Sequence, residues 1–276
     1  YHLLAPIFPK ALMNTIPQKA NLEEILNHHS LILIQNDNSS IAWAWAELRK
    51  QKNTSKIVFF HASKSSFASN NDFEFNTKVP FATNIAHACS RLLKTPFSKD
   101  NGLLSPSKDV FRKFSNRVLI HPTSNDIKRN WTPAQFLELA NILQNDRFNV
   151  HFCISQNEYD QWKEYKDINI KTFDSLKSLL GFIHQSGFLI GNDSGLGHLA
   201  SNLGIPTLTI SGSYKRVRLW RPDWAINKVV VPYFPIPNFK GINFRLRENM
   251  WQNIVSTKKV HKHFKSLIYE SCSTLF

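Results

Sequence analysis

One turn in the second half of the chain combines residue types that bind anions. The apolar run FLIG is followed by NDSGLGH, residues 192–198. A strand that ends in such a turn and leads into a helix presents free backbone N–H groups and the positive end of the helix dipole. Asp193, Ser194, Gly195 and His198 are therefore candidate ligands of a phosphate or diphosphate. The alternative is that Asp193 and Ser194 only cap the helix and that His198 is structural.

A second turn of this kind follows the apolar run RVLIHP, residues 117–122. It offers hydroxyls at Thr123 and Ser124 and cations at Lys128 and Arg129. Hydroxyls with a cation at a strand end can hold a diphosphate. Without the first turn, a solvated loop would be the better interpretation.

The elements that must position these turns alternate between strand and helix. This alternation predicts a parallel sheet with right-handed crossovers, and the near-continuous apolar strands predict helices on both of its faces. Ligands bind at the carboxyl ends of such strands, which is where both turns lie. The predicted strands are residues 31–34, 56–60, 117–122, 148–155, 187–193 and 206–211, and the predicted helices are 41–50, 82–93, 132–144, 158–165, 175–185, 195–203 and 250–269.

The 276 residues suit two domains. Residues 94–116 are rich in Pro, Ser and Lys without sustained periodicity, so we expect the linker there. The predicted N-terminal domain is 1–105. The predicted C-terminal domain is 106–276, with a final helix that packs back.

Composition narrows the class of partner. Lys and Arg total 34 against 20 acids, a net charge of +14, which favours nucleic acid, anionic lipid or a phosphorylated substrate. The basic residues are scattered, so a solvated positive surface is the alternative. Three widely spaced cysteines argue against a zinc knuckle or a disulfide framework and suggest a reducing, cytoplasmic compartment. No apolar run reaches membrane-spanning length, so any membrane contact is expected to be peripheral.

The two turns together resemble a known family. The segment GNDSGLGHLASNLGIPTLTISGS is similar to the D-[ST]-G-x-x-H-x-A-x-x-x-G-x-P segment of the bacterial ADP-heptose:lipopolysaccharide heptosyltransferases, glycosyltransferase family 9. VLIHPTSNDIKRNWTPAQFLELANIL resembles the family's other signature. The resemblance implies an α/β fold of the GT-B type, with two Rossmann-like domains that face each other across a cleft.

The resemblance also implies site residues. Those expected to hold the nucleotide-sugar donor are Thr123, Ser124 and Lys128 at its diphosphate, Asp193, Ser194, Gly195 and His198 at the nucleotide and phosphates, and Glu158 at the ribose or base.

Two features depart from the family. The family begins with a strand and a Gly-Asp loop that supplies the proposed catalytic aspartate, and no such segment precedes Tyr1, so the N-terminal domain is expected to be incomplete in this chain or to continue upstream. Asp37 is the nearest substitute for the catalytic base, with capping of the next helix as its alternative role. The turn HPTS also lacks the family's usual glycine.

The implied reaction is transfer of a sugar, heptose, from an ADP-sugar to a lipopolysaccharide core or related anionic glycolipid, with inversion. A carboxylate would deprotonate the acceptor hydroxyl. The sequence has no Asp-x-Asp motif, so neither a metal nor another cofactor is required. The net charge would favour peripheral contact with the inner membrane surface. Arg216, Arg218 and Arg221 either reach the cleft or are solvated loop cations.

Three alternatives remain. Another GT-B nucleotide-sugar enzyme or an epimerase would prefer uracil nucleotides. A catalytically degenerate paralogue would bind the nucleotide sugar without transferring it. Nucleic-acid binding depends on charge alone and is not expected, because no recognisable motif accompanies the charge.

Overall fold

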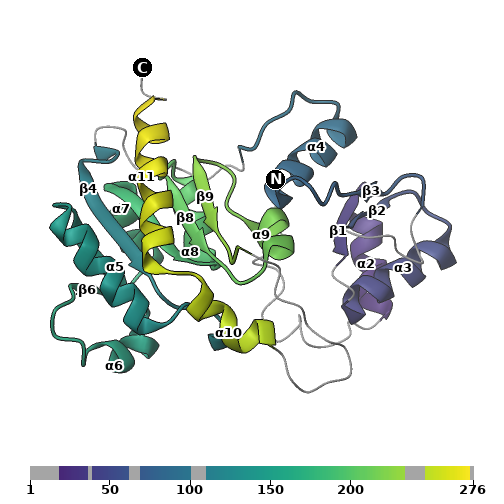
Figure 1. Ribbon diagram of the computed structural model, residues 1–276. Coiled ribbons are helices and arrows are strands. Elements are labelled where there is room, and N and C mark those ends of the chain that lie inside the picture. Colours follow the sequence, from purple (N-terminus) through teal and green to yellow (C-terminus); the bar gives the residue numbers. More distant parts are fainter. Residues whose placement is uncertain (1–18, 37–38, 62–68, 101–109, 234–245, 274–276) are drawn as a thin grey trace. The chain divides into compact units, whose positions relative to one another are not determined.

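The computed structural model describes residues 19–36, 39–61, 69–100, 110–233 and 246–273 (Figure 1). The chain divides into two compact units. The first consists of residues 1–77 and 84–97, and the second of residues 78–83 and 98–276.

The first unit is a small parallel sheet with helices. Its strands are β1 (Ile32–Asn36), β2 (Ile57–His61) and β3 (Phe73–Glu74), in the order β1-β2-β3. Its helices are α2 (Lys19–His28), α3 (Ser40–Lys52) and the greater part of α4 (Phe81–Leu93). The short strand β3 is not among the predicted strands.

An ion pair is buried in the first unit. The Asp72 side chain is only 1% exposed and accepts hydrogen bonds from Arg49 Nη1 at 2.6 Å and from the backbone amides of Phe59 at 2.8 Å and Ser69 at 2.7 Å. Burial alone would raise the pKa of the Asp72 carboxyl, but these hydrogen bonds and the Arg49 charge outweigh it, so the pKa lies below its usual value. The carboxylate therefore fastens α3 and β2 to the loop before β3.

The second unit contains a six-stranded, fully parallel sheet. In chain order its strands are β4 (Phe114–His121), β5 (Asn149–Cys153), β6 (Ile170–Lys171), β7 (Ser186–Asn192), β8 (Thr207–Ile210) and β9 (Asn227–Val230). Their spatial order is β6-β5-β4-β7-β8-β9, so the chain winds outward in one direction from β4 and then in the other from β7. This is the doubly wound, Rossmann-like order, whose switch point lies between β4 and β7.

Helices cover both faces of this sheet, as the apolar strands predict. Alternate residues of β4 point to opposite faces: Val118 and Ile120 join the core beneath α5 (Pro133–Asn145) and α11 (Thr257–Ser273), whereas Leu119 joins the core beneath α7 (Leu176–His184) and α8 (Gly195–Asn202). In Figure 1, α5 and α11 accordingly lie in front of the sheet, with α7 and α8 behind. The parallel α/β class is confirmed.

Several boundaries differ from the prediction. The single helix predicted at 250–269 is two helices, α10 (Leu246–Ile254) and α11, because Ser256 begins a new helix with its hydroxyl accepting from the Lys259 amide at 3.3 Å. The helix predicted at 158–165 is shorter: the 3-10 turn η3 (Gln156–Glu158) precedes α6 (Tyr159–Trp162). The prediction missed α9 (Tyr214–Trp220), capped by Ser213, as well as β6 and β9.

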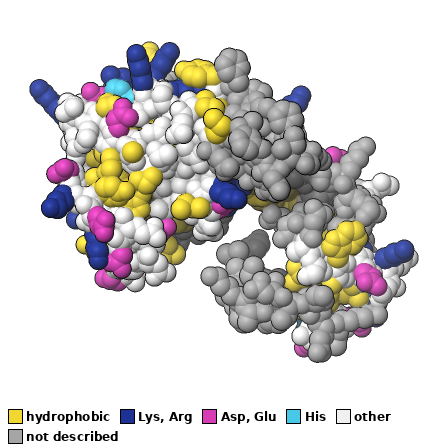
Figure 2. All heavy atoms as spheres, turned by 60° about the horizontal axis from the view of Figure 1, so that its bottom comes forward, with side chains coloured by type: hydrophobic (Ala, Val, Ile, Leu, Met, Phe, Trp, Pro, Cys, Tyr) yellow, Lys and Arg dark blue, Asp and Glu magenta, His cyan; other side chains and the backbone are white. Residues whose placement is uncertain are grey.

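The surface carries charges of both signs. On the face shown in Figure 2, Lys and Arg side chains lie at several separate places, with Asp and Glu between them. Within the described ranges, no helix combines the length and the apolar character that crossing a membrane requires.

Candidate functional site

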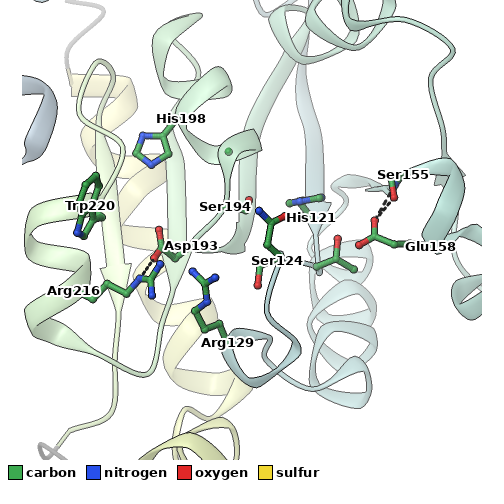
Figure 3. Close-up of a pocket in the computed structure, with 13 residues that line it drawn as sticks. His121, Ser124, Arg129, Ser155, Glu158, Asp193, Ser194, His198, Arg216 and Trp220 are labelled. Atoms are coloured by element: carbon green, nitrogen blue, oxygen red, sulfur yellow. Dashed lines mark hydrogen bonds and ion pairs between the residues drawn. The ribbon is translucent and has the colours of Figure 1, made fainter. Parts of the chain in front are cut away.

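A pocket of about 430 Å³ lies at the carboxyl ends of the strands of the second unit. The segments after β4, β5, β7 and β8 all contribute to it, so it straddles the switch point of the sheet. Figure 3 shows the residues that line it. They are His121, Thr123, Ser124, Asn125, Arg129, Ser155, Glu158, Asp193, Ser194, Gly195, His198, Arg216 and Trp220.

The turn between β7 and α8 leaves polar groups unengaged. Ser194 occupies the N-cap position of α8, yet its side chain makes no capping hydrogen bond. Its Oγ atom is buried and has no hydrogen-bond partner among the described residues. A Cβ atom added to Gly195 would meet no atom of the described residues within 4 Å, apart from the adjoining residues and the backbone of α8 itself. A buried hydroxyl without a partner is costly unless a ligand satisfies it, so this turn has the features of an anion site.

Asp193 is held by a cation from the next element. Its Oδ2 accepts from Arg216 Nε at 2.8 Å, and the Asp193 side chain is only 10% exposed. Arg216 lies on α9, where its backbone amide donates to the capping hydroxyl of Ser213. The pair therefore joins the turn after β7 to the helix after β8.

In the loop after β4, the hydroxyl of Ser124 forms its hydrogen bonds within the loop itself. Ser124 Oγ donates to Asn130 Oδ1 at 2.6 Å and lies 3.0 Å from the Asp126 carbonyl oxygen. Thr123 is buried at the pocket wall. The 3-10 turn η2 (Ile127–Arg129) follows, and Arg129 Nε donates to Asp126 Oδ2 at 3.3 Å.

Buried Asn192 joins the two halves of the switch point. Its Oδ1 accepts from the Trp131 amide at 2.9 Å, and its Nδ2 donates to the Pro122 carbonyl at 2.6 Å. Pro122 and Trp131 flank the loop after β4, so this one side chain fixes that loop against the end of β7. Asn192 belongs to the sequence motif, but its role could not be predicted, because its partners lie on a distant segment of the chain.

His121 is the last residue of β4 and faces the pocket as a neutral ring. Its Nδ1 lies 2.8 Å from the Cys153 carbonyl oxygen, which only accepts, so Nδ1 carries the proton and Nε2 is an acceptor. Burial holds the pKa of His121 below its usual value, although the hydrogen bond to Cys153 and the charge of Glu158 oppose this. His121 and Ser155 also line a second, more apolar cavity of about 450 Å³, whose walls include Phe173 and Leu179.

Glu158 and His198 lie on opposite sides of the pocket in Figure 3. Glu158 ends η3 and closes a capping box, in which its Oε2 accepts from the amide of Ser155 at 3.2 Å and from its hydroxyl. Burial lowers the pKa of His198, while the Asp193 charge and the Trp220 backbone favour the protonated form. The walls of the pocket thus carry two carboxylates, two guanidinium groups and several hydroxyls.

The structure brings together every donor-side residue named from the sequence except Lys128. Lys128 is exposed and does not line the pocket; the Trp251 indole and the Gln252 amide both donate to its backbone carbonyl. Arg129 is the pocket cation contributed by this loop. Asp37 lies outside the described residues.

Of the three arginines after β8, only Arg216 lines the pocket. Arg221 donates to the Arg218 carbonyl at 2.9 Å, and Arg218 lies near the Tyr214 ring.

The sequence prediction did not name His121, Ser155 or Trp220 as site residues. The strand ends identified in the sequence could have pointed to His121 and Ser155, whereas Trp220 lies on the helix that was missed. Across the described ranges, no three His, Cys, Asp or Glu side chains gather as a metal ion would need.

The fold and the pocket define a Rossmann-like α/β protein with a candidate anion site at its switch point. A sequence model described as glycosyltransferase family 9 (heptosyltransferase) matches residues 90–237, more than half of the chain. The chain therefore belongs to this family.

The similar proteins include one curated relative and two solved structures. The lipopolysaccharide core heptosyltransferase OpsX of Haemophilus influenzae is 28% identical over 119 residues, 40% of this chain and 34% of that protein, so the match spans about a third of the relative's length. E. coli ADP-heptose lps heptosyltransferase II has a TM-score of 0.57 at 14% identity, over 92% of this chain and 81% of that chain. E. coli heptosyltransferase WaaC with ADP has a TM-score of 0.55 at 11% identity, over 95% and 79%. The GT-B type of fold is thereby confirmed.

Proposed function

We propose that the protein is a glycosyltransferase that moves a sugar, heptose, from an ADP-sugar to a lipopolysaccharide core or related glycolipid, with inversion and without a metal. One observation carries the proposal: the residues that the family resemblance assigns to the donor, Lys128 aside, line one pocket at the switch point of the sheet. Membership of glycosyltransferase family 9 supports the reaction class, and the names of the similar heptosyltransferases support the donor and acceptor.

The proposed donor lies with its diphosphate over the turn between β7 and α8. Ser194 Oγ and the first amides of α8 donate to the phosphate oxygens, and Gly195 leaves room for close approach. Glu158, at the far wall, accepts from ribose hydroxyls. The adjoining apolar cavity lined by Phe173 and Leu179 suits a flat nucleobase.

The chemical step breaks the bond between the anomeric carbon and a diphosphate oxygen and forms a bond from that carbon to an acceptor oxygen. A base takes the acceptor proton, and the bonding pair leaves with the diphosphate. Preorganised donors stabilise the charge that grows on the diphosphate. We assign the base to Asp37, whose replacement by Asn is expected to lower kcat about a hundredfold or more while ADP affinity is unchanged. Unchanged kcat in that variant would remove Asp37 from the mechanism.

Calorimetric titration with ADP and with UDP, each in the presence of EDTA, tests the donor assignment. Saturable binding of ADP in preference to UDP is the expected result. A preference for UDP would move the protein to another nucleotide-sugar reaction. Binding of neither would contradict the proposed donor site, and binding of ADP without transfer to any lipid acceptor would indicate a degenerate paralogue. Binding that requires Mg²⁺ would contradict the metal-free step.

We also propose that the protein works at the cytoplasmic surface of the inner membrane, because a net charge of +14 attracts it to anionic lipid and to a phosphorylated acceptor. Sedimentation with vesicles of anionic lipid, and not with neutral vesicles, is expected, with release at high salt. Equal affinity for both vesicle types would contradict this. Stronger binding to duplex DNA than to the vesicles would instead favour a nucleic-acid partner.

A further inference from the structure

Two arginines line the pocket from different elements. Arg129 ends the turn η2 after β4, and Arg216 lies on α9 after β8, so they approach from the two sides of the switch point. In the view of Figure 3, both guanidinium groups are turned toward the Asp193 side chain. The sequence offered both Lys128 and Arg129 as cations, and the family resemblance assigned the diphosphate to Lys128.

Each guanidinium group is anchored through one nitrogen and leaves the others unengaged. Arg216 Nε donates to Asp193 at 2.8 Å, and Arg129 Nε donates to Asp126 at 3.3 Å. Among the described residues, the terminal nitrogens of both side chains have no hydrogen-bond partner. An arginine held at Nε keeps its forked pair of terminal N–H groups in a fixed orientation, which matches two oxygens of a phosphate.

The remaining donors of the pocket lie nearby on the same turn as Asp193. Ser194 Oγ is buried and lacks a partner within the described part of the chain, and α8 begins without a side-chain cap. The Ser194 hydroxyl, the amides at the helix start and the two guanidinium groups together supply the donors that phosphate oxygens need. The charges of the two guanidinium groups equal those of the two carboxylates in the lining, Asp193 and Glu158, so the positive end of the α8 dipole adds the remaining attraction for an anion. The terminal oxygens of a diphosphate are spread over two phosphorus atoms, so it can contact both arginines and the helix start at once.

Lys128 and Arg129 are adjacent in sequence, but their side chains point in different directions. In a 3-10 turn, consecutive side chains are about 120° apart, so only one of the two faces the pocket. That residue is Arg129, since Lys128 is exposed and the η2 backbone is fixed at its carbonyl by Trp251 Nε1 at 3.0 Å.

We propose that Arg129 and Arg216 form a two-sided clamp on the diphosphate of the donor, in place of Lys128, and that they hold the diphosphate as it leaves. This inference rests on the proposed function for its substrate, although its test does not. As the bond to the anomeric carbon breaks, negative charge collects on the diphosphate oxygens that the two guanidinium groups face.

Inorganic diphosphate is the probe, because it contains the group in question and no base or sugar. Titrations followed by ³¹P NMR compare the unaltered protein with its Arg129→Gln and Arg216→Gln variants. Each variant is expected to weaken diphosphate binding at least about tenfold, since hydrogen bonds between charged groups are the strong ones. Lys215→Gln removes an exposed lysine next to Arg216 on α9 and is the matched control, with affinity unchanged.

Two further variants separate the clamp from general effects. Arg216→Lys keeps the charge but not the fork, and is expected to lose affinity while Asp193 remains paired and the thermal midpoint is retained. Lys128→Gln is expected to bind diphosphate as tightly as the unaltered protein. A loss in Lys128→Gln with none in Arg129→Gln would overturn the assignment. So would diphosphate affinity that is unchanged in both arginine variants, or no diphosphate binding by the unaltered protein.

The outcome for the donor is separate. If diphosphate binding depends on both arginines but ADP binds no better than diphosphate, the clamp holds and the ADP-sugar proposal fails. If ADP binds with preference over UDP and the arginine variants bind it unchanged, the proposed function holds and the clamp fails. For a clamp on an ADP-sugar, the loss in each arginine variant is larger for ADP than for AMP.

Discussion

The glycines at positions 191 and 195 serve different purposes although they lie close together in sequence. Gly191 is on β7, paired with His121 of β4, and an added Cβ atom there would lie 2.6 Å from the His121 carbonyl oxygen. Gly195 begins α8, and within the described part of the chain an added Cβ atom there would have open space beyond the backbone of α8 itself. Packing between β7 and β4 therefore requires a glycine at position 191, whereas no contact among the described residues requires one at position 195.

This contrast predicts opposite results for two alanine variants. Gly191→Ala forces the backbone of β7 away from β4 and is expected to destabilise the fold by roughly 1–3 kcal/mol. Gly195→Ala is expected to leave stability unchanged or slightly higher, because alanine is the better helix former, and to weaken nucleotide binding. Urea unfolding and ADP titration measure the two effects. Equal destabilisation by both substitutions would contradict the assignment of Gly195 to a ligand.

At the scale of elements, the pocket depends on a connection between two segments far apart in sequence. Asn192 at the end of β7 is 2% exposed and binds the backbone of Pro122 and Trp131 on either side of the loop after β4. The Trp131 indole continues the connection by donating to the Val255 carbonyl at 2.9 Å, just before α11. The orientation of Arg129 therefore depends on side chains of β7 and of the C-terminal helices.

Replacement of Asn192 by Ala is expected to destabilise the protein by at least about 2 kcal/mol. The substitution leaves one buried amide and one buried carbonyl without partners, and each such group costs about 1–3 kcal/mol. Asn141→Ala, on the exposed face of α5, is the matched control, with little change or a slight gain. Chemical denaturation measures both variants. A loss in Asn192→Ala no larger than in the control would show that the loop is held by other contacts.

At the scale of the whole molecule, four buried or half-buried histidines have pKa values displaced in the same direction. Burial is the main cause of the lowered pKa of His121, His151, His184 and His198, with Arg117 and Lys171 adding to it at His151. The folded state therefore binds fewer protons than the unfolded state below the ordinary histidine pKa of about 6.5. The stability they contribute is present above that value and is lost as the pH falls below it.

The protein is accordingly expected to become less stable between about pH 7 and about pH 5, by up to about 1.4 kcal/mol per pH unit for each histidine that stays neutral when folded. Asp72, whose pKa is also lowered, adds a further loss only below its ordinary pKa of about 3.9. Urea denaturation at stepped pH measures the slope. His184→Phe, in a site beside the Phe111 ring, is expected to reduce the slope. A flat profile from pH 7 to pH 5 would contradict the prediction.

The sequence by itself determined the class of fold and the outline of the site. Apolar strands that alternate with helices define a parallel sheet through local periodicity, and turns such as NDSGLGH mark the strand ends where ligands bind. Asp193, Ser194 and Gly195 could be named because their role depends on a strand end and a helix start, which are local features. The prediction missed β6 and α9 because both are short and their sequences have only a weak local pattern of apolar residues.

Only the tertiary structure decided which side chains share the pocket. The choice of Arg129 over Lys128 depends on the rotation of a three-residue turn, which backbone contacts with Trp251 and Gln252 hold in place. The entry of Arg216 depends on strand order, because β8 follows β7 outward from the switch point and brings α9 over Asp193. Packing between distant segments sets which of these side chains come together. The periodicity of residues along the chain carries no information about that packing.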